Sequence, residues 1–411
     1  MMRQLFDRKI HDIKKYIIIL TLFTCLLLSA CGKTEQAESI PKAPSVEEHK
    51  SETESQPESE LKFQPESKLS ETSLSEIPNS EPPQEEDTHP YDFTICFAGD
   101  INLDENWCTT QYLNTRENGI KDCISPELLT HMNNADIMCL NNEFTYSLRG
   151  TPLNGKAYTF RANPERVEIL HEMGVDIVKL ANNHVYDYGM DALLDTFETL
   201  ENAGIAYMGA GRNLEQAMTP VYIELDDKTV AFVAASRAEK NKMTPQATEE
   251  KPGILRCYDT ELFLESIKEA KSNADFVLAY VHWGTEYSYD LEEVQLTTGK
   301  DYLDAGADVI IGAHSHCLQG MEYYDGKPII YSLGNYWFNE KTLDTMLLDL
   351  HFYGDDEESR LDVKVIPAIQ SGYCTNIVTE QEEKDRIYSF LEEISVNVTI
   401  DEMGQVLESD E

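Results

Sequence analysis

The chain has 411 residues, which is enough for one large domain or two, with a sizeable hydrophobic core. Its 75 acidic residues against 33 Lys and Arg give a formal net charge of −42. This charge argues against a general nucleic-acid-binding protein, which needs a basic face. The acidic residues are spread along the chain, as is typical of a solvated acidic surface.

Residues 1–30 predict a lipoprotein signal peptide. Basic residues precede an apolar run over residues 16–28, which is too short for a comfortable membrane span. The run ends in a Leu-Ser-Ala-Cys segment that resembles the bacterial lipobox, which implies cleavage before Cys31 and lipidation of its sulfur. An ordinary signal peptide or signal anchor with a chance cysteine is the alternative. We expect a protein that is lipid-anchored on the extracellular side of the cell membrane.

Residues 31–90 form the second expected region. They are rich in Ser, Glu, Pro, Gln and Lys and hold few aromatic residues. Such a composition cannot bury enough apolar surface to fold, so we expect a disordered stalk that spaces the next region from the membrane.

Residues 91–380 predict the folded domain, since short apolar runs alternate there with helical stretches. The expected strands are residues 93–98, 137–140, 177–180, 221–225, 230–234, 276–281, 309–311, 329–332, 346–352 and 361–366. The expected helices are residues 126–133, 164–173, 190–203, 259–272 and 291–305. Strand–helix alternation together with short hairpin turns predicts an α/β fold of two packed sheets with helices outside. Residues 381–411 are expected to add one amphipathic helix, 384–394, and an acidic tail.

Residues of the type that bind metals follow the first two predicted strands. Gly99 lets the backbone turn sharply before Asp100, although this pair alone is more typical of an ordinary turn. Glu143 ends an Asn-Asn-Glu segment that is either a carboxylate ligand with orienting amides or a helix cap. Neither segment is specific by itself.

Asn183 and His184 follow the third predicted strand. A side-chain amide oxygen beside an imidazole suits a divalent metal ion or a phosphate-like oxyanion. Asp187 either holds His184 in place or caps the helix that is expected to begin near residue 190.

The most specific element is a Gly-Ala-His-Ser-His segment that carries His314 and His316. Two imidazoles separated by one residue, just past a strand end, can aim at one point in space. His282 adds a third imidazole and Glu286 a carboxylate, although a single histidine there is more often structural. Asn335 follows a glycine turn and is expected to shape a wall of the site.

These segments together resemble the CapA family of capsule and poly-γ-glutamate biosynthesis proteins, from about residue 92 to about residue 349. The matching stretches are residues 97–100, 142–143, 180–184, 187–189, 209–211, 282–287, 305–308, 312–316 and 331–335. The resemblance implies a branch of the calcineurin-like metallophosphoesterases. It also implies a four-layer αββα sandwich that holds two metal ions.

The superfamily's pattern implies roles for individual residues of this chain. It implies metal ligands at Asp100, Glu143, Asn183, His282, His314 and His316, with Glu143 bridging two ions and His184 meeting a phosphate. We further predict a catalytic role for Asp187 beside His184, and supporting roles for Asn102, Glu286 and Asn335. The superfamily usually opens with Asp-x-His, whereas this chain has Asn102 at the third position, which weakens the expectation of a second ion.

The resemblance implies a membrane-anchored extracellular protein that supports synthesis or export of an anionic capsule polymer, expected to be poly-γ-glutamate. Its expected partners are membrane capsule-synthase components, and its cofactor one or two divalent ions of Mn, Zn or Fe. A secreted metal-dependent phosphoesterase that acts on another phosphoester is the alternative. A non-catalytic binding module is disfavoured, because unpaired buried histidines and carboxylates are costly.

Overall fold

The computed structural model describes residues 90–238, 243–355 and 357–409. The predicted signal peptide, Cys31 and the stalk as far as residue 89 therefore lie outside the described residues. Two compact units divide the chain at residue 80, and the fold below belongs to the second unit, Glu81–Glu411. Among the helices of the described ranges, none combines the length and the apolar character that crossing a bilayer requires.

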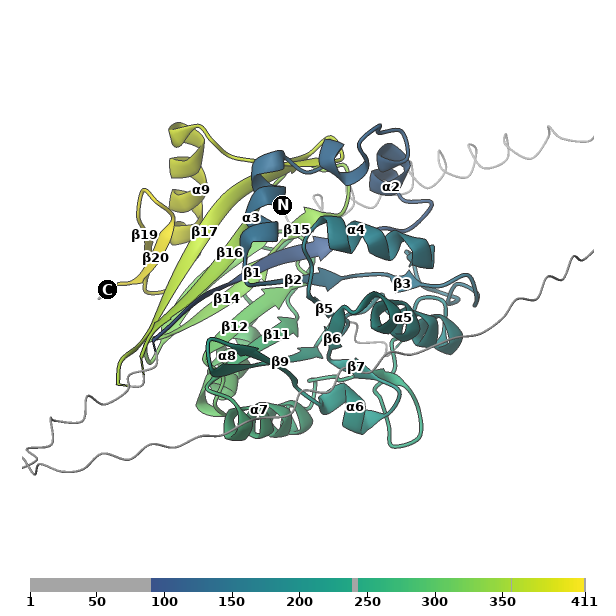
Figure 1. The fold of residues 1–411 in the computed structure, drawn as a ribbon, viewed down its shortest axis with the longest axis horizontal. Coiled ribbons are helices and arrows are strands. Elements are labelled where there is room, and N and C mark those ends of the chain that lie inside the picture. The colour runs from purple at the N-terminus through teal and green to yellow at the C-terminus, as the bar shows by residue number, and fades with distance from the viewer. Residues whose placement is uncertain (1–89, 239–242, 356, 410–411) are drawn as a thin grey trace, which may run out of the picture. The chain divides into compact units, whose positions relative to one another are not determined.

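A large mixed sheet forms one half of the unit (Figure 1). Its strand order is β19-β20-β17-β16-β1-β2-β5-β6, with β15 paired to β1 and β18 paired to β17. Its strands are β1 (Tyr91–Ile101), β2 (Ile137–Asn142), β5 (Ile177–Lys179), β6 (Ala206–Met208), β15 (Asn335–Trp337), β16 (Leu343–Gly354), β17 (Ser359–Ser371), β18 (Cys374–Ile377), β19 (Val398–Ile400) and β20 (Gln405–Glu408). β1, β2, β5 and β6 are parallel neighbours, so their carboxyl ends meet at one edge.

A second sheet has the order β13-β14-β12-β11-β9-β8. Its strands are β8 (Val221–Leu225), β9 (Lys228–Ser236), β11 (Phe276–His282), β12 (Val309–Ala313), β13 (Leu318–Tyr324) and β14 (Lys327–Leu333). β9, β11, β12 and β14 run parallel. Two short pairs complete the strands, β3 (Thr145–Tyr146) with β4 (Arg161–Ala162) and β7 (Ala210–Gly211) with β10 (Gly253–Ile254).

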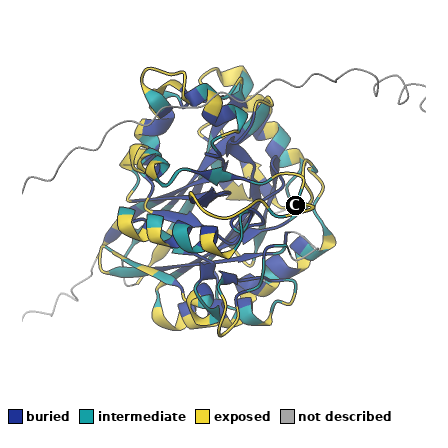
Figure 2. Ribbon diagram, turned by 90° about the vertical axis from the view of Figure 1, so that its right-hand side faces the viewer, coloured by how far each residue is buried: buried dark blue, intermediate teal, exposed yellow. Residues whose placement is uncertain are grey.

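The helices of the described ranges are α2 (Cys108–Leu113), α3 (Pro126–Asn134), α4 (Val167–Glu172), α5 (Met190–Ala203), α6 (Leu214–Met218), α7 (Glu261–Asn273), α8 (Glu293–Asp304) and α9 (Gln381–Glu393), with 3₁₀ turns η1 (Gly119–Asp122) and η2 (Pro164–Arg166). The helices α3 to α8 lie outside the two sheets, whereas α9 packs on the core between them. α3, α4 and α5 pack apolar side chains on the large sheet, and α6, α7 and α8 pack theirs on the smaller sheet. The burial pattern in Figure 2 follows this layering, with exposed residues concentrated on the helices and loops.

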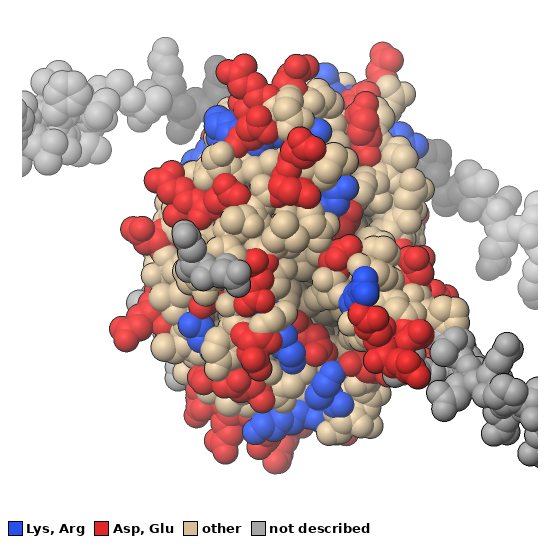
Figure 3. Space-filling model, turned by 90° about the vertical axis from the view of Figure 1, so that its left-hand side faces the viewer, with Lys and Arg blue, Asp and Glu red and all other residues tan. Residues whose placement is uncertain are grey.

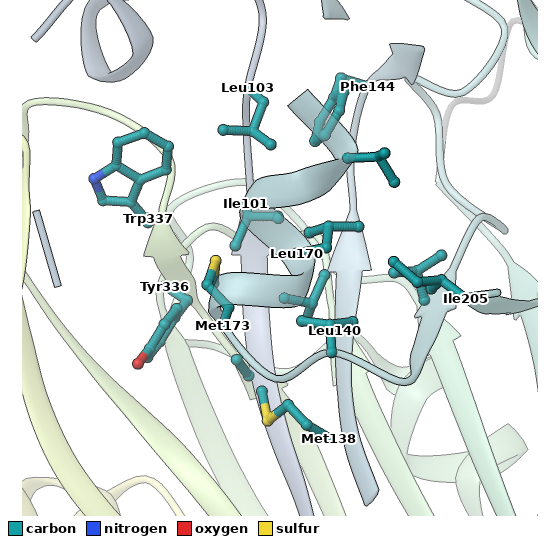
Figure 4. Close-up of a cluster of buried hydrophobic side chains, with 14 of the residues drawn as sticks. Ile101, Leu103, Met138, Leu140, Phe144, Leu170, Met173, Ile205, Tyr336 and Trp337 are labelled. Carbon is teal, nitrogen blue, oxygen red and sulfur yellow. The ribbon is translucent and has the colours of Figure 1, made fainter. Parts of the chain in front are cut away.

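Strand β1 shows why two sheets face each other. Phe93, Ile95 and Phe97 point into the core between the sheets, while Cys96 and Ala98 belong to the core under the helices. A strand that is buried on both faces needs a continuous apolar run instead of alternation, and the sequence supplies one here. Figure 4 shows the helix-side core, where Leu170 and Met173 lie beside residues of β1 and β2. The predicted four-layer αββα sandwich is therefore confirmed.

The end of the chain differs from the sequence expectation. The expected helix 384–394 is present as α9, and its buried residues join the core between the sheets. The residues that follow were expected to be an acidic tail, but Val398, Ile400 and Val406 are buried and belong to two strands. β20 pairs with β17, so this segment extends the large sheet. The sequence did carry a signal for this hairpin, since Val396, Val398 and Ile400 alternate with polar residues and Gly404 precedes Val406.

Acidic side chains are widely distributed over the surface. Figure 3 shows Asp and Glu spread over the face at the left-hand side of Figure 1, with fewer Lys and Arg among them. The sequence interpretation of a dispersed acidic surface agrees with this view.

Candidate metal centre

The carboxyl ends of the parallel strands of both sheets carry the candidate site. Asp100 lies at the end of β1, where the register with β2 shifts between Ala98 and Asp100. Gly99 is required here, because a Cβ at this position would lie 1.9 Å from the carbonyl oxygen of Gly334. The backbone N–H of Asp100 donates to the same carbonyl at 2.9 Å, which fixes the carboxylate at the sheet edge.

A first cluster consists of Glu143, His282 and His314, whose nearest ligand atoms all lie within 4.8 Å of one another. Glu143 Oε1 is 3.6 Å from His282 Nε2, and the ring centroids of His282 and His314 are 4.6 Å apart. Asn183 Oδ1 lies 2.8 Å from His282 Nε2, so this amide oxygen joins the cluster. The predicted residues Glu143, Asn183, His282 and His314 are thus brought together.

A second cluster consists of Asp100, Glu143 and His316, again within 4.8 Å. His316 Nδ1 lies 3.1 Å from Asp100 Oδ2 and 2.8 Å from Asn335 Oδ1. Asn141 Nδ2 donates to both carboxylates, at 2.6 Å to Asp100 and 2.9 Å to Glu143. Glu143 belongs to both clusters, which is the position that a bridging carboxylate requires.

The two histidines of the Gly-Ala-His-Ser-His segment have unusual backbones. His314 has φ 95° and His316 has φ 56°, a region that residues other than glycine rarely adopt. Such conformations store free energy and persist only where the surroundings impose them. Both imidazoles consequently face Glu143, one in each cluster.

Atoms without partners indicate that the clusters fit a cation. Glu143 Oε1 and His314 Nδ1 are buried, and neither has a hydrogen-bond partner among the described residues. Leaving such atoms unpaired costs about 1–3 kcal/mol each. Imidazole, carboxylate and amide donors are the set that Zn²⁺, Mn²⁺ and Fe²⁺ take in proteins. The donor chemistry therefore fits one or two divalent ions.

The protonation of the site follows from its burial. Burial raises the pKa of Glu143 well above its usual value, and the nearby Asp100 adds to this. Burial lowers the pKa of His314 to about 3, so its ring is neutral and can offer a lone pair. Burial also lowers the pKa of His316, but Glu143 and Asp100 outweigh it and raise that pKa to about 9. A cation would relieve the cost of the buried carboxylates.

Lys179 is a fully buried member of the site that the sequence analysis did not single out. Its Nζ lies 2.9 Å from His282 Nδ1 and 4.4 Å from the ring centroid of Tyr280. Burial lowers the pKa of Lys179 to about 7, against the opposing effect of Asp100 and Glu143. The signal was available, since Lys179 is a charged residue inside an apolar strand run directly before the Asn-Asn-His segment.

His184 lies beside the clusters and is held by Asp187. His184 Nδ1 is 2.6 Å from Asp187 Oδ2, and burial lowers the pKa of His184 although Asp187 opposes this. Asp187 also binds Lys156 Nζ at 2.6 Å. Of the two alternatives left open for Asp187, the structure shows the one that orients His184, because Gly189 occupies the N-cap of α5.

The supporting residues have different positions. Asn335 does more than form a wall, because its Oδ1 contacts His316 directly. Asn102 Oδ1 accepts a hydrogen bond from the backbone N–H of Asp104 at 2.8 Å, and its buried Nδ2 has no hydrogen-bond partner among the described residues. Glu286 is exposed and lines the cavities in front of the clusters instead of joining them.

The four layers and the carboxylate–imidazole clusters at one edge of the sheets define an αββα sandwich protein with a candidate metal centre, as the metallophosphoesterase resemblance implied. The chain belongs to the family described as bacterial capsule synthesis protein PGA_cap, whose model matches residues 94–340. The predicted membership of the CapA family is thereby confirmed.

Curated relatives agree with this membership. The chain is 34% identical over 200 residues to the PGA biosynthesis protein CapA of Bacillus subtilis, covering 48% of this chain and 52% of the relative. It is 35% identical over 234 residues to the capsule biosynthesis protein CapA of Bacillus anthracis, covering 55% and 56%. A probable polyglutamine synthesis accessory protein of Mycobacterium tuberculosis is 27% identical over 208 residues, covering 49% and 55%. The chain thus spans about half the length of these relatives.

Solved structures show weaker likenesses. A putative 5'-nucleotidase from Staphylococcus aureus has 18% identity and a TM-score of 0.41, covering 73% of this chain and 58% of that one. A hypothetical protein from Thermus thermophilus has 15% identity and a TM-score of 0.40, covering 68% and 99%.

Proposed function

We propose that this protein is an accessory protein for the synthesis or export of an anionic capsule polymer, namely poly-γ-glutamate, and that it acts through a divalent-metal site. Family membership supports the capsule context, as does the name of the Bacillus subtilis relative, which is a PGA biosynthesis protein. The observation that carries the metal site is the pair of buried clusters that share Glu143.

The residues present would hold Mn, Zn or Fe in two unequal positions. Glu143, His282, His314 and Asn183 offer donors for one ion, and Asp100, Glu143 and His316 offer donors for another. A divalent ion there would polarise an ester or amide oxygen of the substrate and neutralise developing negative charge. At the second position, Asn102 stands where the superfamily pattern has a histidine, so that position lacks this imidazole donor.

His184 is the proposed proton acceptor. Its Nδ1 faces Asp187 Oδ2 at 2.6 Å, so the neutral ring donates from Nδ1 and leaves the Nε2 lone pair available. His184 lines a cavity in front of the clusters, where Nε2 can take a proton from a hydroxyl group or a water molecule. Asp187 keeps this tautomer and is itself held by Lys156.

Lipidation at Cys31 would anchor the protein on the extracellular side of the membrane, beside the membrane components of a capsule synthase. The sequence around Cys31 supports this anchor. With a net charge of −42, most of the surface repels an anionic polymer, so contact with the polymer would be local to the cleft.

Two experiments test the proposal. Metal analysis of the purified full-length protein should find one or two divalent ions per chain, and His314→Ala should lose at least one of them. In the native host, deletion of the gene should abolish the surface polymer. Complementation with the wild type should restore it, and complementation with His314→Ala should not. Full polymer production with the His314→Ala variant would contradict a role for the site.

A metal-dependent phosphoesterase that acts on another phosphoester is the second candidate, which the oriented His184–Asp187 pair favours. Manganese-dependent hydrolysis of an aryl phosphodiester, lost in His184→Gln with metal content unchanged, would support it. If a His184→Gln strain lost this hydrolysis but still produced the polymer normally, the phosphoesterase activity would be separate from the capsule role.

A further inference from the structure

Two cavities meet at Glu286 in front of the metal clusters. The first, of about 290 Å³, has an aromatic wall and includes His316; it is lined by Trp107, Tyr158, Phe160, His184, Glu286, Tyr287, His316, Phe338, Asn339, Glu340 and Lys341. The second, of about 360 Å³, is lined by Arg237, Ala238, Tyr258, Gly284, Thr285, Glu286, Glu292 and His314. The cleft therefore continues on both sides of the two cluster histidines.

Arg237 is fixed in the second cavity by its backbone. It directly follows β9, and its N–H donates to the carbonyl oxygen of His282 at 2.8 Å. The N–H of Ala238 donates to the same oxygen at 3.1 Å. These hydrogen bonds hold the backbone of Arg237 against the end of β11, where His282 of the first cluster lies.

The guanidinium of Arg237 is held in place by Tyr258, but it makes few hydrogen bonds within the described residues. Its Cζ lies 4.7 Å from the ring centroid of Tyr258, and one N–H donates to the Tyr258 carbonyl at 3.3 Å. Within the described part of the chain, no carboxylate forms an ion pair with it. A guanidinium has five N–H donors in a planar fork, which suits a carboxylate or a phosphate. Stacking on Tyr258 keeps the fork in place without using those donors.

Lys341 gives the first cavity a cation of its own. Its Nζ lies 3.3 Å from the ring centroid of Tyr287, and the described residues offer it no carboxylate within ion-pair distance. Each cavity therefore has a basic residue resting on an aromatic ring. Glu286 lines both cavities, Glu340 also lines the first and Glu292 the second. In a chain with 75 acidic residues, this arrangement provides two local positions for anions beside the metal centre.

We propose, building on the proposed function, that the cleft binds an extended chain with an anionic group on each side of the metal centre, one at Arg237 and one at Lys341. The carboxylate of Glu286 disfavours a third anion between them. The shared ligand chemistry is a repeating anion, carried either by carboxylates or by phosphodiesters. A single small phosphate would use only one of the two cations.

Equilibrium binding to the metal-loaded full-length protein tests this assignment. The probes are a fluorescent penta-γ-glutamate, a glycerol-phosphate oligomer of equal charge, and inorganic phosphate. Arg237→Ala should weaken binding of the preferred oligomer about tenfold, since it removes hydrogen bonds from a charged donor to an anionic acceptor. Lys341→Ala should weaken it about threefold, as expected for an exposed charge. The affinity for inorganic phosphate should fall in only one of these two variants.

The controls are Arg116→Ala and Lys384→Ala, which remove cations that line neither cavity and should leave binding unchanged. Arg237→Lys should recover part of the affinity, because it keeps the charge and loses the planar fork. The inference would be overturned if either cleft variant bound the oligomer within twofold of wild type, or if the controls lost as much affinity. It would also be overturned if the wild type bound neither oligomer. If binding follows metal content but not Arg237, the inference fails while the proposed function stands.

Discussion

Lys179 Nζ lies 2.9 Å from His282 Nδ1, and both side chains are fully buried. This contact turns the other ring nitrogen of His282 toward Asn183 and Glu143. Residues that bind metals are usually oriented by a carboxylate or a carbonyl group, whereas here an amine has that position. The site therefore contains a basic group whose charge state is linked to the stability of the fold.

Lys179→Met should change how stability depends on pH in the metal-free protein. The pKa of Lys179 is lowered by burial from 10.5 to about 7, so the unfolded chain holds the extra proton between these values. Wild-type stability should therefore rise with pH across that window, by up to about 1.4 kcal/mol per unit. The free energy of unfolding should be measured with urea at pH 7, 8 and 9, and it should rise less steeply with pH in Lys179→Met than in wild type. The exposed Lys268→Met is the control, and equal slopes in all three proteins would contradict the prediction.

Glu143→Gln should abolish metal binding without unfolding the protein. The substitution keeps the shape of the side chain and removes the carboxylate that both clusters share. Since burial raises the pKa of Glu143, the metal-free variant should be at least as stable as wild type. Metal analysis and thermal unfolding in chelator measure the two effects. The matched control is the exposed Glu286→Gln, which should retain the metal; retention of metal by Glu143→Gln would be the opposing result.

Gly99→Ala should strongly destabilise the fold. The added Cβ would lie 1.9 Å from the Gly334 carbonyl, which forces apart the end of β1 and the turn before β15. We expect a loss above about 3 kcal/mol, the range of severe overpacking. Gly326→Ala is the comparison, because a Cβ there meets nothing within 4 Å and only the φ of 70° is unfavourable, costing about 1–2 kcal/mol. Similar midpoints in urea for the two variants would refute the steric argument.

Asn102→His should strengthen the second metal position. A histidine at this position restores the Asp-x-His pattern of the superfamily and adds an imidazole next to Asp100. Titration with Mn²⁺ should show tighter binding of the second ion, with the first unchanged. Because Asn102 also accepts a hydrogen bond from Asp104, a loss of about 1 kcal/mol in stability is expected alongside. A second ion no tighter than in wild type would show that position 102 does not face the centre.

The sequence predicted the site's carboxylates and imidazoles because they follow strand ends, where chain order and sheet topology bring them together. Glu143 and His314 illustrate this, since each directly follows the carboxyl end of its strand, β2 in the large sheet and β12 in the smaller sheet. Arg237 was missed because its long side chain reaches the site from a position without a recognisable motif. Lys179 was missed although its charge inside an apolar strand run was a usable signal. The role of Asn335 was underestimated, because its contact with His316 depends on how β15 pairs with β1.

The two sheets contribute different chemistry to the clusters. Asp100 and Glu143 come from the large sheet, and His282, His314 and His316 come from the smaller one. Neither half of the sandwich has both acids and these imidazoles, so the docking of the sheets creates the complete ligand set. An ion that bound there would fasten one sheet to the other and would favour the folded chain by mass action.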